Sequence, residues 1–438
     1  MTKQAATILM VVAVGCGDDG GRGPSTTIDP SGVSVGDGGT GDDGSASTAG
    51  DDDGAGSGSA ADDAPPDDNG DETPDDDGMI WDVGSNGGEG CGEGNAGDLS
   101  YSYLWVANSP QGTMSKINTE TLVEEGRYYV RPDSGGSPSR TSVGLSGDVA
   151  VAARSGGMSK FYANAAECGA GETSTGKEDV KPFPDPCLAW HTPFNYSSHR
   201  GVAWAPAEWD EASCSYINEK LWSAGVSSGT VEVALLDGET GTVEDSVQVP
   251  EAGGGVGVYG AAVDSAGNFW GWVPSGSRLL KVDRATLVAT TWQTPSGGYG
   301  ITVDHKDRPW LCSGQATRFD PVTEMFQSTS SSGGGGTGCM EDGQGTLWIG
   351  TGNGISGIDI DSVTAAGHLD APGFIKGVSI QEDGAGKIFV WGVTMSQDAY
   401  KIDPMTNTYE TFTGLNSPYT YSDMTGFALG NVVGDPSG

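Results

Sequence analysis

Four residues at the predicted starts of short apolar strands could contact a ligand or assist proton transfer. His199 and Arg200 precede the strand Gly201-Val-Ala-Trp204, whereas Tyr259 and Tyr299 each precede a glycine that opens a strand. An imidazole can accept a proton or hold a metal ion, and a cation or a donor can hold developing negative charge. We therefore expect these four side chains to lie at a ligand-binding mouth. A structural role in a loop is the alternative for the first two.

The strands that would position these residues belong to a repeated unit. Three copies each begin with a short apolar strand led by Gly, carry Asp at the fifth position and carry Trp at the eleventh. The three Asp–Trp pairs are Asp264–Trp270, Asp304–Trp310 and Asp342–Trp348. A period of about forty residues with short strands and tight turns is typical of a β-propeller, in which each repeat forms one small sheet.

The chain order predicts an all-β fold, a single closed propeller of seven four-stranded blades over residues 91–438. The second blade is degenerate, so six or eight blades remain alternatives. The first blade has no inner strand before Leu104-Trp-Val-Ala-Asn108. We expect the C-terminal stretch Thr425-Gly-Phe-Ala-Leu429 to supply that strand, because such closure protects the edges of an open stack.

The repeat resembles the streptogramin B lyase-like group of propellers and, more loosely, the YVTN and NHL types. The resemblance covers roughly residues 101–429 and implies a seven-bladed propeller, a fold that hosts many functions. It is carried by Tyr259-Gly-Ala-Ala-Val-Asp264 with Trp270, Tyr299-Gly-Ile-Thr-Val-Asp304 with Trp310, and Trp105-Val-Ala-Asn108 followed by Lys116-Ile-Asn118.

The metal-assisted site of that lyase group is not matched. The resemblance implies a His near the start of an inner strand and a Glu three residues after the Trp. Of the histidines, only His199 lies near such a strand start. The positions three residues after Trp hold Asn108, Gly225, Val273, Ser313 and Thr351, none of which is a carboxylate base.

Other chemical groups have structural explanations. No two of the four histidines are spaced so that both could bind one metal from a single element, and His305 and His368 fall in predicted turn or outer-strand positions. Glu341 and Asp342 could meet a cation, but Asp342 is the turn residue of the repeat. The sequence therefore predicts no catalytic residue, no metal ligand and no cofactor. Besides His305 and His368, the histidines are His191 and His199.

The charge of the chain excludes several partners. The formal net charge is −39, which would repel a nucleic-acid backbone and disfavours docking on anionic lipid. We expect a monomer that binds no nucleic acid and meets a membrane only through a lipid anchor.

Residues 1–16 have the features of an export signal. Lys3 supplies positive charge, and the apolar run Ile8–Val14 is too short to span a bilayer. The ending Gly15-Cys16 resembles a bacterial lipoprotein signal, which implies that Cys16 is lipidated. An ordinary secretory signal is the alternative. The predicted location is the outer membrane, on its periplasmic or cell-surface side.

Residues 17–90 are rich in Gly, Asp, Ser and Pro and poor in aromatic residues. Such a segment cannot bury enough apolar surface to offset its chain entropy, so we expect a disordered acidic tether. Its style resembles the tethers of myxobacterial lipoproteins.

Six cysteines follow Cys16, and an even number in an exported chain favours disulfides. Cys168 and Cys187 bracket an insertion, and Cys312 and Cys339 could bridge neighbouring sheets. Cys91 and Cys214 pair by elimination only, and buried free thiols remain an alternative.

The predicted function is that of an exported, lipid-anchored binding or scaffold module for a protein or glycan ligand rather than an enzyme. Aromatic residues near the insertions would suit binding, although core packing explains most of them. The alternative is a metal-assisted lyase or hydrolase with a relocated site and a divalent cation. The aromatic residues are Trp190, Tyr196, Trp204 and Trp209.

Overall fold

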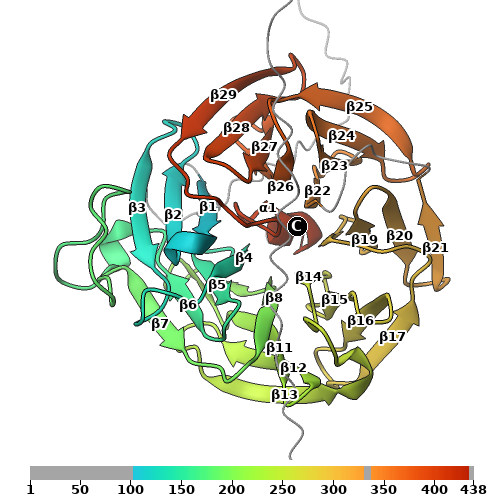
Figure 1. The fold of residues 1–438 in the computed structure, drawn as a ribbon, viewed down its shortest axis with the longest axis horizontal. Helices are drawn as coiled ribbons and strands as arrows, with labels where there is room; N and C mark the ends of the chain where they lie inside the picture. Colours follow the sequence, from blue (N-terminus) through green and yellow to red (C-terminus); the bar gives the residue numbers. More distant parts are fainter. Residues whose placement is uncertain (1–101, 330–336, 434–438) are drawn as a thin grey trace, which may run out of the picture. The chain divides into compact units, whose positions relative to one another are not determined.

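The computed structural model describes residues 102–329 and 337–433 (Figure 1). The predicted export signal (1–16), the lipidation site Cys16 and the predicted tether (17–90) lie outside the described residues. The described residues contain 29 strands and one short α-helix. The strands form seven sheets around a centre and one separate hairpin. The predicted all-β propeller with seven blades is confirmed.

The strands follow the chain from the inner to the outer edge of each blade. Blade 1 contains β1 (Tyr103–Asn108), β2 (Thr113–Asn118) and β3 (Glu124–Tyr129). Blade 2 contains β4 (Pro138–Val143), β5 (Val149–Ala153), β6 (Met158–Phe161) and β7 (Leu188–Thr192). Blade 3 contains β8 (Ser198–Ala205), β11 (Lys220–Ser227), β12 (Thr230–Asp237) and β13 (Val243–Val249), with the hairpin β9 (Glu208–Asp210) and β10 (Ser215–Ile217) inserted.

The remaining blades are regular antiparallel sheets of four consecutive strands. Blade 4 contains β14 (Gly260–Val263), β15 (Phe269–Val273), β16 (Arg278–Val282) and β17 (Ala289–Gln293). Blade 5 contains β18 (Gly300–Val303), β19 (Pro309–Cys312), β20 (Ala316–Asp320) and β21 (Met325–Ser328). Blade 6 contains β22 (Cys339–Glu341), β23 (Thr346–Thr351), β24 (Gly354–Asp359) and β25 (Thr364–Asp370). Blade 7 contains β26 (Ile375–Glu382), β27 (Ile388–Thr394), β28 (Asp398–Asp403) and β29 (Thr408–Thr413).

Burial falls from the inner to the outer strand of a blade. All eight residues of β26 are buried, whereas six of the seven residues of β25 and five of the six residues of β29 are exposed. Apolar side chains on inner and middle strands pack against the next blade, which one blade alone could not achieve. Trp105, Trp222 and Trp310 are among the fully buried side chains of this core.

The repeated Asp and Trp are joined by a hydrogen bond in blades 4, 5 and 6. The indole Nε1 donates to the Asp carboxylate at 2.8 Å in the first two blades and at 2.9 Å in the third. The other carboxylate oxygen accepts a backbone N–H of the turn in each case, for example that of Arg308 on Asp304 at 3.0 Å. The motif therefore fixes the first turn of each blade and buries its charge with partners.

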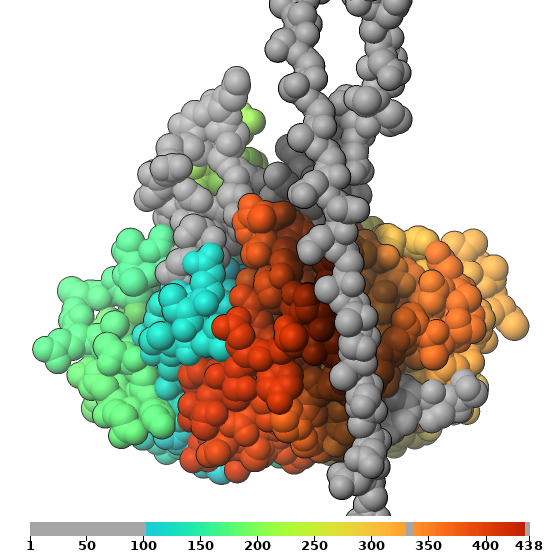
Figure 2. Space-filling model, turned by 90° about the horizontal axis from the view of Figure 1, so that it is seen from above, coloured from blue at the N-terminus to red at the C-terminus, as the bar shows by residue number. Residues whose placement is uncertain are grey.

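The ring closes where blade 1 meets blade 7 (Figure 2). The expected inner strand at Thr425–Leu429 is wrong, because α1 (Phe427–Val433) occupies most of that stretch. An irregular segment just before it lies beside β1 instead. Trp105 N donates to Met424 O at 2.8 Å, and Tyr419 N donates to Ala107 O at 3.0 Å. Blade 1 therefore has three strands and an irregular fourth edge, not four strands.

The C-terminal segment, residues 414–433, fills the centre of the ring, where Figure 1 shows α1. Its residues bond to several blades: Thr141 N donates to Ser422 Oγ at 2.9 Å, and Asn431 Nδ2 donates to Glu341 Oε2 at 2.6 Å. A Cβ added at Gly377 would lie 2.5 Å from Thr420 O, so the segment approaches this inner strand too closely for any larger residue.

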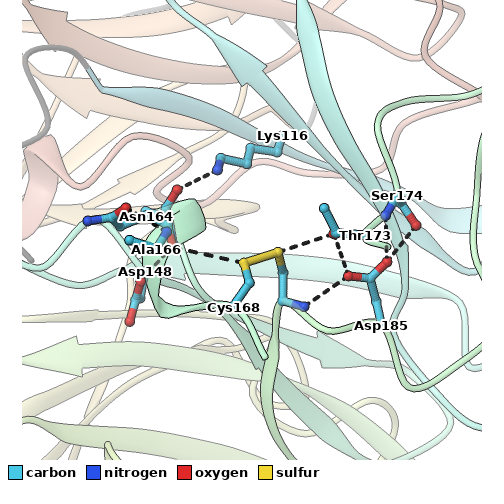
Figure 3. Close-up of a disulfide and its surroundings, with 10 residues drawn as sticks. Lys116, Asp148, Asn164, Ala166, Cys168, Thr173, Ser174 and Asp185 are labelled. Carbon is cyan, nitrogen blue, oxygen red and sulfur yellow. Dashed lines mark hydrogen bonds between the residues drawn. A yellow bond between two sulfur atoms is a disulfide. The ribbon is translucent and has the colours of Figure 1, made fainter. Parts of the chain in front are cut away.

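The insertion of blade 2, between β6 and β7, is tied back by the predicted Cys168–Cys187 disulfide (Figure 3). Asp185 organises the same loop, because its carboxylate accepts from Thr173 Oγ1 at 2.7 Å and from Ser174 N at 2.8 Å. A loop without a core of its own thus obtains its shape from a covalent bond and a buried carboxylate.

The second predicted bridge, Cys312–Cys339, is also present and joins blade 5 to blade 6. Cys91 lies outside the described residues, so its pairing with Cys214 stays a prediction.

Candidate functional site

The inner strands all begin at one end of the central channel, and basic and tyrosine side chains gather there. Each is placed by the start of an inner strand, by a loop at the same end or by the C-terminal segment. We call this set the cationic mouth; it consists of Arg140, Arg154, Arg200, Lys376, Tyr259, Tyr299, Tyr419 and Tyr421.

Three tyrosine hydroxyls meet at the centre of the mouth. The hydroxyl of Tyr419 lies 2.8 Å from that of Tyr259 and 2.6 Å from that of Tyr299. The rings of Tyr259 and Tyr299 meet edge to face with centroids 4.9 Å apart, and the ring centroid of Tyr421 lies 4.5 Å from that of Tyr299. Strand starts in blades 4 and 5 are thereby tied to the C-terminal segment.

The basic side chains lie over the faces of these rings. The guanidinium carbon of Arg140 is 3.2 Å from the ring centroid of Tyr421, and Lys376 Nζ is 3.6 Å from that of Tyr299. Arg200 lies over Tyr259 at 5.4 Å. Such cation–π contacts are favourable because the ring faces carry negative charge.

Arg140 is the most buried of these cations, with 1% of its surface exposed. Its Nε donates to Tyr259 O at 3.0 Å and its Nη1 to Ser139 O at 3.0 Å. Its Nη2 is buried and has no hydrogen-bond partner among the described residues, and the same holds for Nε of Arg200. Two guanidinium nitrogens at the mouth are therefore left without acceptors.

Burial, and to a smaller extent neighbouring cations, lowers the pKa values of the basic side chains of the mouth. Burial lowers the pKa of Arg140 to about 9, and the nearby Arg200 acts in the same direction. Burial and then Arg140 lower the pKa of Lys376 to about 8. For Tyr419, burial favours a higher pKa, but hydrogen bonds from Tyr259 and Tyr299, with the charge of Arg140, outweigh it and lower the pKa.

The structure brings three of the four predicted site residues together and separates the fourth. Arg200, Tyr259 and Tyr299 lie in the cationic mouth. His199 is 0% exposed, and its ring packs between blade strands and the aromatic residues Phe194 and Tyr196. Its Nε2 lies 2.8 Å from Ser223 Oγ, and burial lowers its pKa to about 3, so it is a neutral core residue.

The other histidines lie away from the mouth. His191 Nδ1 lies 2.9 Å from Ser159 Oγ on β6, and His368 is on the outer strand β25. His305 is in the turn after β18, where its Nδ1 lies 3.1 Å from Glu341 Oε1. That buried carboxylate serves as an anchor for α1. No group of three or more His, Cys, Asp or Glu side chains that could hold a metal ion occurs among the described residues.

The aromatic residues near the insertions do not form an exposed cluster. Trp190, Tyr196 and Trp204 are buried, and Trp209 packs edge to face on Tyr216 in the inserted hairpin. A separate open hollow of about 600 Å³ lies on blade 7 and includes Phe374, whose ring is 5.7 Å from Lys376 Nζ. Within residues 102–329 and 337–433, no helix is long and apolar enough to cross a membrane.

Comparisons with known proteins give only distant similarities. No family model and no curated protein matches the chain. A catalytically inactive virginiamycin B lyase from Staphylococcus aureus with quinupristin is 13% identical, with 72% of this chain and 88% of that chain covered and a TM-score of 0.45. AztD from Citrobacter koseri is 10% identical, with 74% and 97% covered and a TM-score of 0.46.

A protein of unknown function from Bacteroides caccae is also similar, at 10% identity, 62% and 94% coverage and a TM-score of 0.40. All three TM-scores are below 0.5 and all three identities are below 25%, so we draw nothing about the fold family or the activity from these similarities. The seven-bladed propeller follows from the sheets of this chain itself.

Five mouth residues were missed by the sequence analysis. Arg140 precedes the inner strand core of blade 2 much as Arg200 does in blade 3, and Lys376 is the second residue of β26. Strand-start position could therefore have identified both. Tyr419 and Tyr421 gave no such signal, because they lie in an irregular segment outside the repeat, and Arg154 lies in a loop.

Proposed function

We propose that the chain is an exported, lipid-anchored binding module that takes its ligand, a protein or a glycan, at the cationic mouth. The observation that carries the proposal is the convergence of Arg140, Arg200 and Lys376 with a tyrosine cluster at one end of the channel. These side chains come from separate blades, and arginines and tyrosines are the residues that most often dominate binding energy.

Binding is favoured over catalysis because the mouth offers donors and cations but no visible acid–base pair. The positions three residues after Trp in the blades hold no carboxylate, and His199 is buried and neutral. The channel behind the mouth is filled by the C-terminal segment, so a ligand would rest on the mouth rather than pass through the ring.

The proposal includes an anchor at Cys16. The motivation is the short apolar run, the Gly15-Cys16 ending and the polar sequence that follows. We expect Cys16→Ser to move the protein from the membrane fraction to the soluble fraction, measured by immunoblotting after fractionation of the native host. A variant that stays in the membrane fraction after a salt wash would count against lipidation.

Binding itself is tested with arrays of glycans and envelope proteins probed with the mature wild-type chain and Arg200→Gln. We expect at least one ligand whose signal falls in the variant, while Arg284→Gln, in a turn at the other end of blade 4, binds as the wild type does. Signals that the mouth variant leaves unchanged would contradict the proposal. Turnover of a bound ligand would point instead to a lyase or hydrolase.

A further inference from the structure

The arginines of the mouth are not neutralised within the described part of the chain. None of the ion pairs among the described residues includes Arg140, Arg154 or Arg200. Their hydrogen bonds within the described residues go to backbone carbonyls and to serine hydroxyls, as when Arg154 Nη2 donates to Ser109 Oγ at 2.8 Å. In a chain of net charge −39, this excess of positive charge is a local exception.

The mouth also holds buried polar atoms without hydrogen-bond partners among the described residues. Buried polar groups in folded proteins are nearly always hydrogen-bonded, so each exception calls for an explanation, such as a ligand. Of the eleven such atoms among the described residues, five belong to mouth residues or to residues beside them in the chain or in space: Ser139 Oγ, Arg140 Nη2, Arg200 Nε, Thr337 Oγ1 and Tyr421 OH.

The cations also repel one another. Arg200 disfavours the charged form of Arg140, Arg154 disfavours that of Arg200, and Arg140 disfavours that of Lys376. Each cation therefore makes the charged form of its neighbour less favourable, and a bound anion would offset that repulsion. The described residues therefore leave the positive charge of the three arginines without a counter-ion, as is expected of an anion-binding site.

We propose that the cationic mouth recognises an oxyanion, the carboxylate of an acidic sugar or a phosphate ester, carried by a glycan. The partly buried guanidinium groups of Arg154 and Arg200 bind its oxygens, since a guanidinium can donate two parallel hydrogen bonds to a carboxylate or a phosphate, and the fully buried Arg140 adds its positive charge. The hydroxyls and the ring edges of Tyr259 and Tyr299, whose faces lie against the basic side chains, contact the sugar that carries it. This inference rests on the proposed function and specifies its ligand class.

The test is calorimetric titration of the full mature chain in detergent with four probes: trigalacturonate, inorganic phosphate, neutral galactotriose and tetraglutamate. We expect trigalacturonate or phosphate to bind, with affinity that weakens as salt is added, and galactotriose to give no heat. Arg200→Gln should weaken the anion about tenfold or more, because a hydrogen bond to a charged group is lost. Arg284→Gln, with the same change of charge, should bind within about twofold of the wild type.

Arg140 is fully buried, so Arg140→Gln could unfold the chain; Arg154→Gln is the second variant and should also weaken the anion. Equal binding of galactotriose and trigalacturonate, or unchanged binding in both mouth variants, would overturn the inference. Tetraglutamate binding more tightly than both anions would assign the mouth to an acidic peptide and reject the glycan. Neutral ligands that depend on Arg200 would sink the inference but leave the proposed function standing.

Discussion

The charged side chains at the two ends of the central channel differ in how fully they are hydrogen-bonded. At the turn end, the carboxylates of Asp264, Asp304 and Asp342 are buried, and each accepts an indole N–H together with backbone N–H groups of its own blade. At the mouth end, Arg140 and Arg200 are held by stacking on tyrosine rings, and each has a nitrogen without an acceptor among the described residues.

From this difference between the two ends of the channel we infer that the turn end stabilises the fold and the mouth end binds a ligand. Where the repeat is written out in full, each repeated Asp has hydrogen-bond donors within its own blade, so the motif is explained by stability. Where the sequence departs from the repeat, the charges are left unbalanced although this is unfavourable for the isolated protein. Function is expected at the end that the repeat does not satisfy.

We expect the largest change in stability for Asp304→Ala at the turn end. The substitution removes the acceptor of Trp310 Nε1 and of Arg308 Nε, which both lie at 2.8 Å, and leaves the mostly buried Arg308 with the exposed Asp361 as its only ionic partner among the described residues. We expect the free energy of unfolding to fall by about 3–5 kcal/mol, measured by chemical denaturation. Asp245→Ala, exposed on β13, should change it by less than about 0.5 kcal/mol.

Binding at the mouth should survive in Asp304→Ala at a temperature where it is folded. If anion affinity falls as much as in Arg200→Gln, the two ends are coupled and the proposed separation is wrong.

A smaller effect is expected for Tyr419→Phe at the mouth. The ring contacts remain, but the hydroxyl that lies within 2.8 Å of two other hydroxyls is lost, so the free energy of unfolding should fall by about 1 kcal/mol. Since the pKa of Tyr419 is lowered, it should ionise before the ordinary tyrosines in an ultraviolet titration, and this early phase should vanish in the variant.

Tyr409→Phe on the outer strand β29 is the matched control, because it removes one exposed phenol and should leave the early phase in place. An early phase that persists in Tyr419→Phe would show that another group causes it.

The smallest effect concerns pH and the anchor of α1. The hydrogen bond to Glu341 raises the pKa of His305. This stabilisation is fully present below the ordinary histidine pKa and is lost as pH rises through the raised value. Wild type should therefore lose its advantage in melting temperature over His305→Gln between about pH 6 and about pH 8. An advantage that is constant or grows with pH would contradict the assignment.

Much of the fold could be predicted because the repeated residues are the ones that make the hydrogen bonds of each blade. The spacing of Asp304 and Trp310 reflects a hydrogen bond, and the same spacing in two more blades gave the period, the strand order and the turn. The C-terminal segment could not be predicted in this way. Thr425–Leu429 is apolar enough for an inner strand, but the centre of the ring offers it other partners, so α1 forms there instead.

The site could be predicted only in part. Arg200, Tyr259 and Tyr299 were found because strand starts around a ring share one end. His199 directly precedes Arg200 at the same strand start. Its side chain nevertheless points into the core, since neighbouring residues of a strand face opposite sides. The contribution of Tyr419 depends on where an irregular segment comes to rest, which no local pattern specifies.

The central claim is that the mouth is an oxyanion site. The most direct measurement is X-ray diffraction from crystals of the mature chain soaked in sodium selenate, with the bound ion located by its anomalous signal. We expect the strongest selenate peak within hydrogen-bond reach of the guanidinium groups of Arg154 and Arg200. An empty mouth in crystals that hold selenate elsewhere on the protein would contradict it.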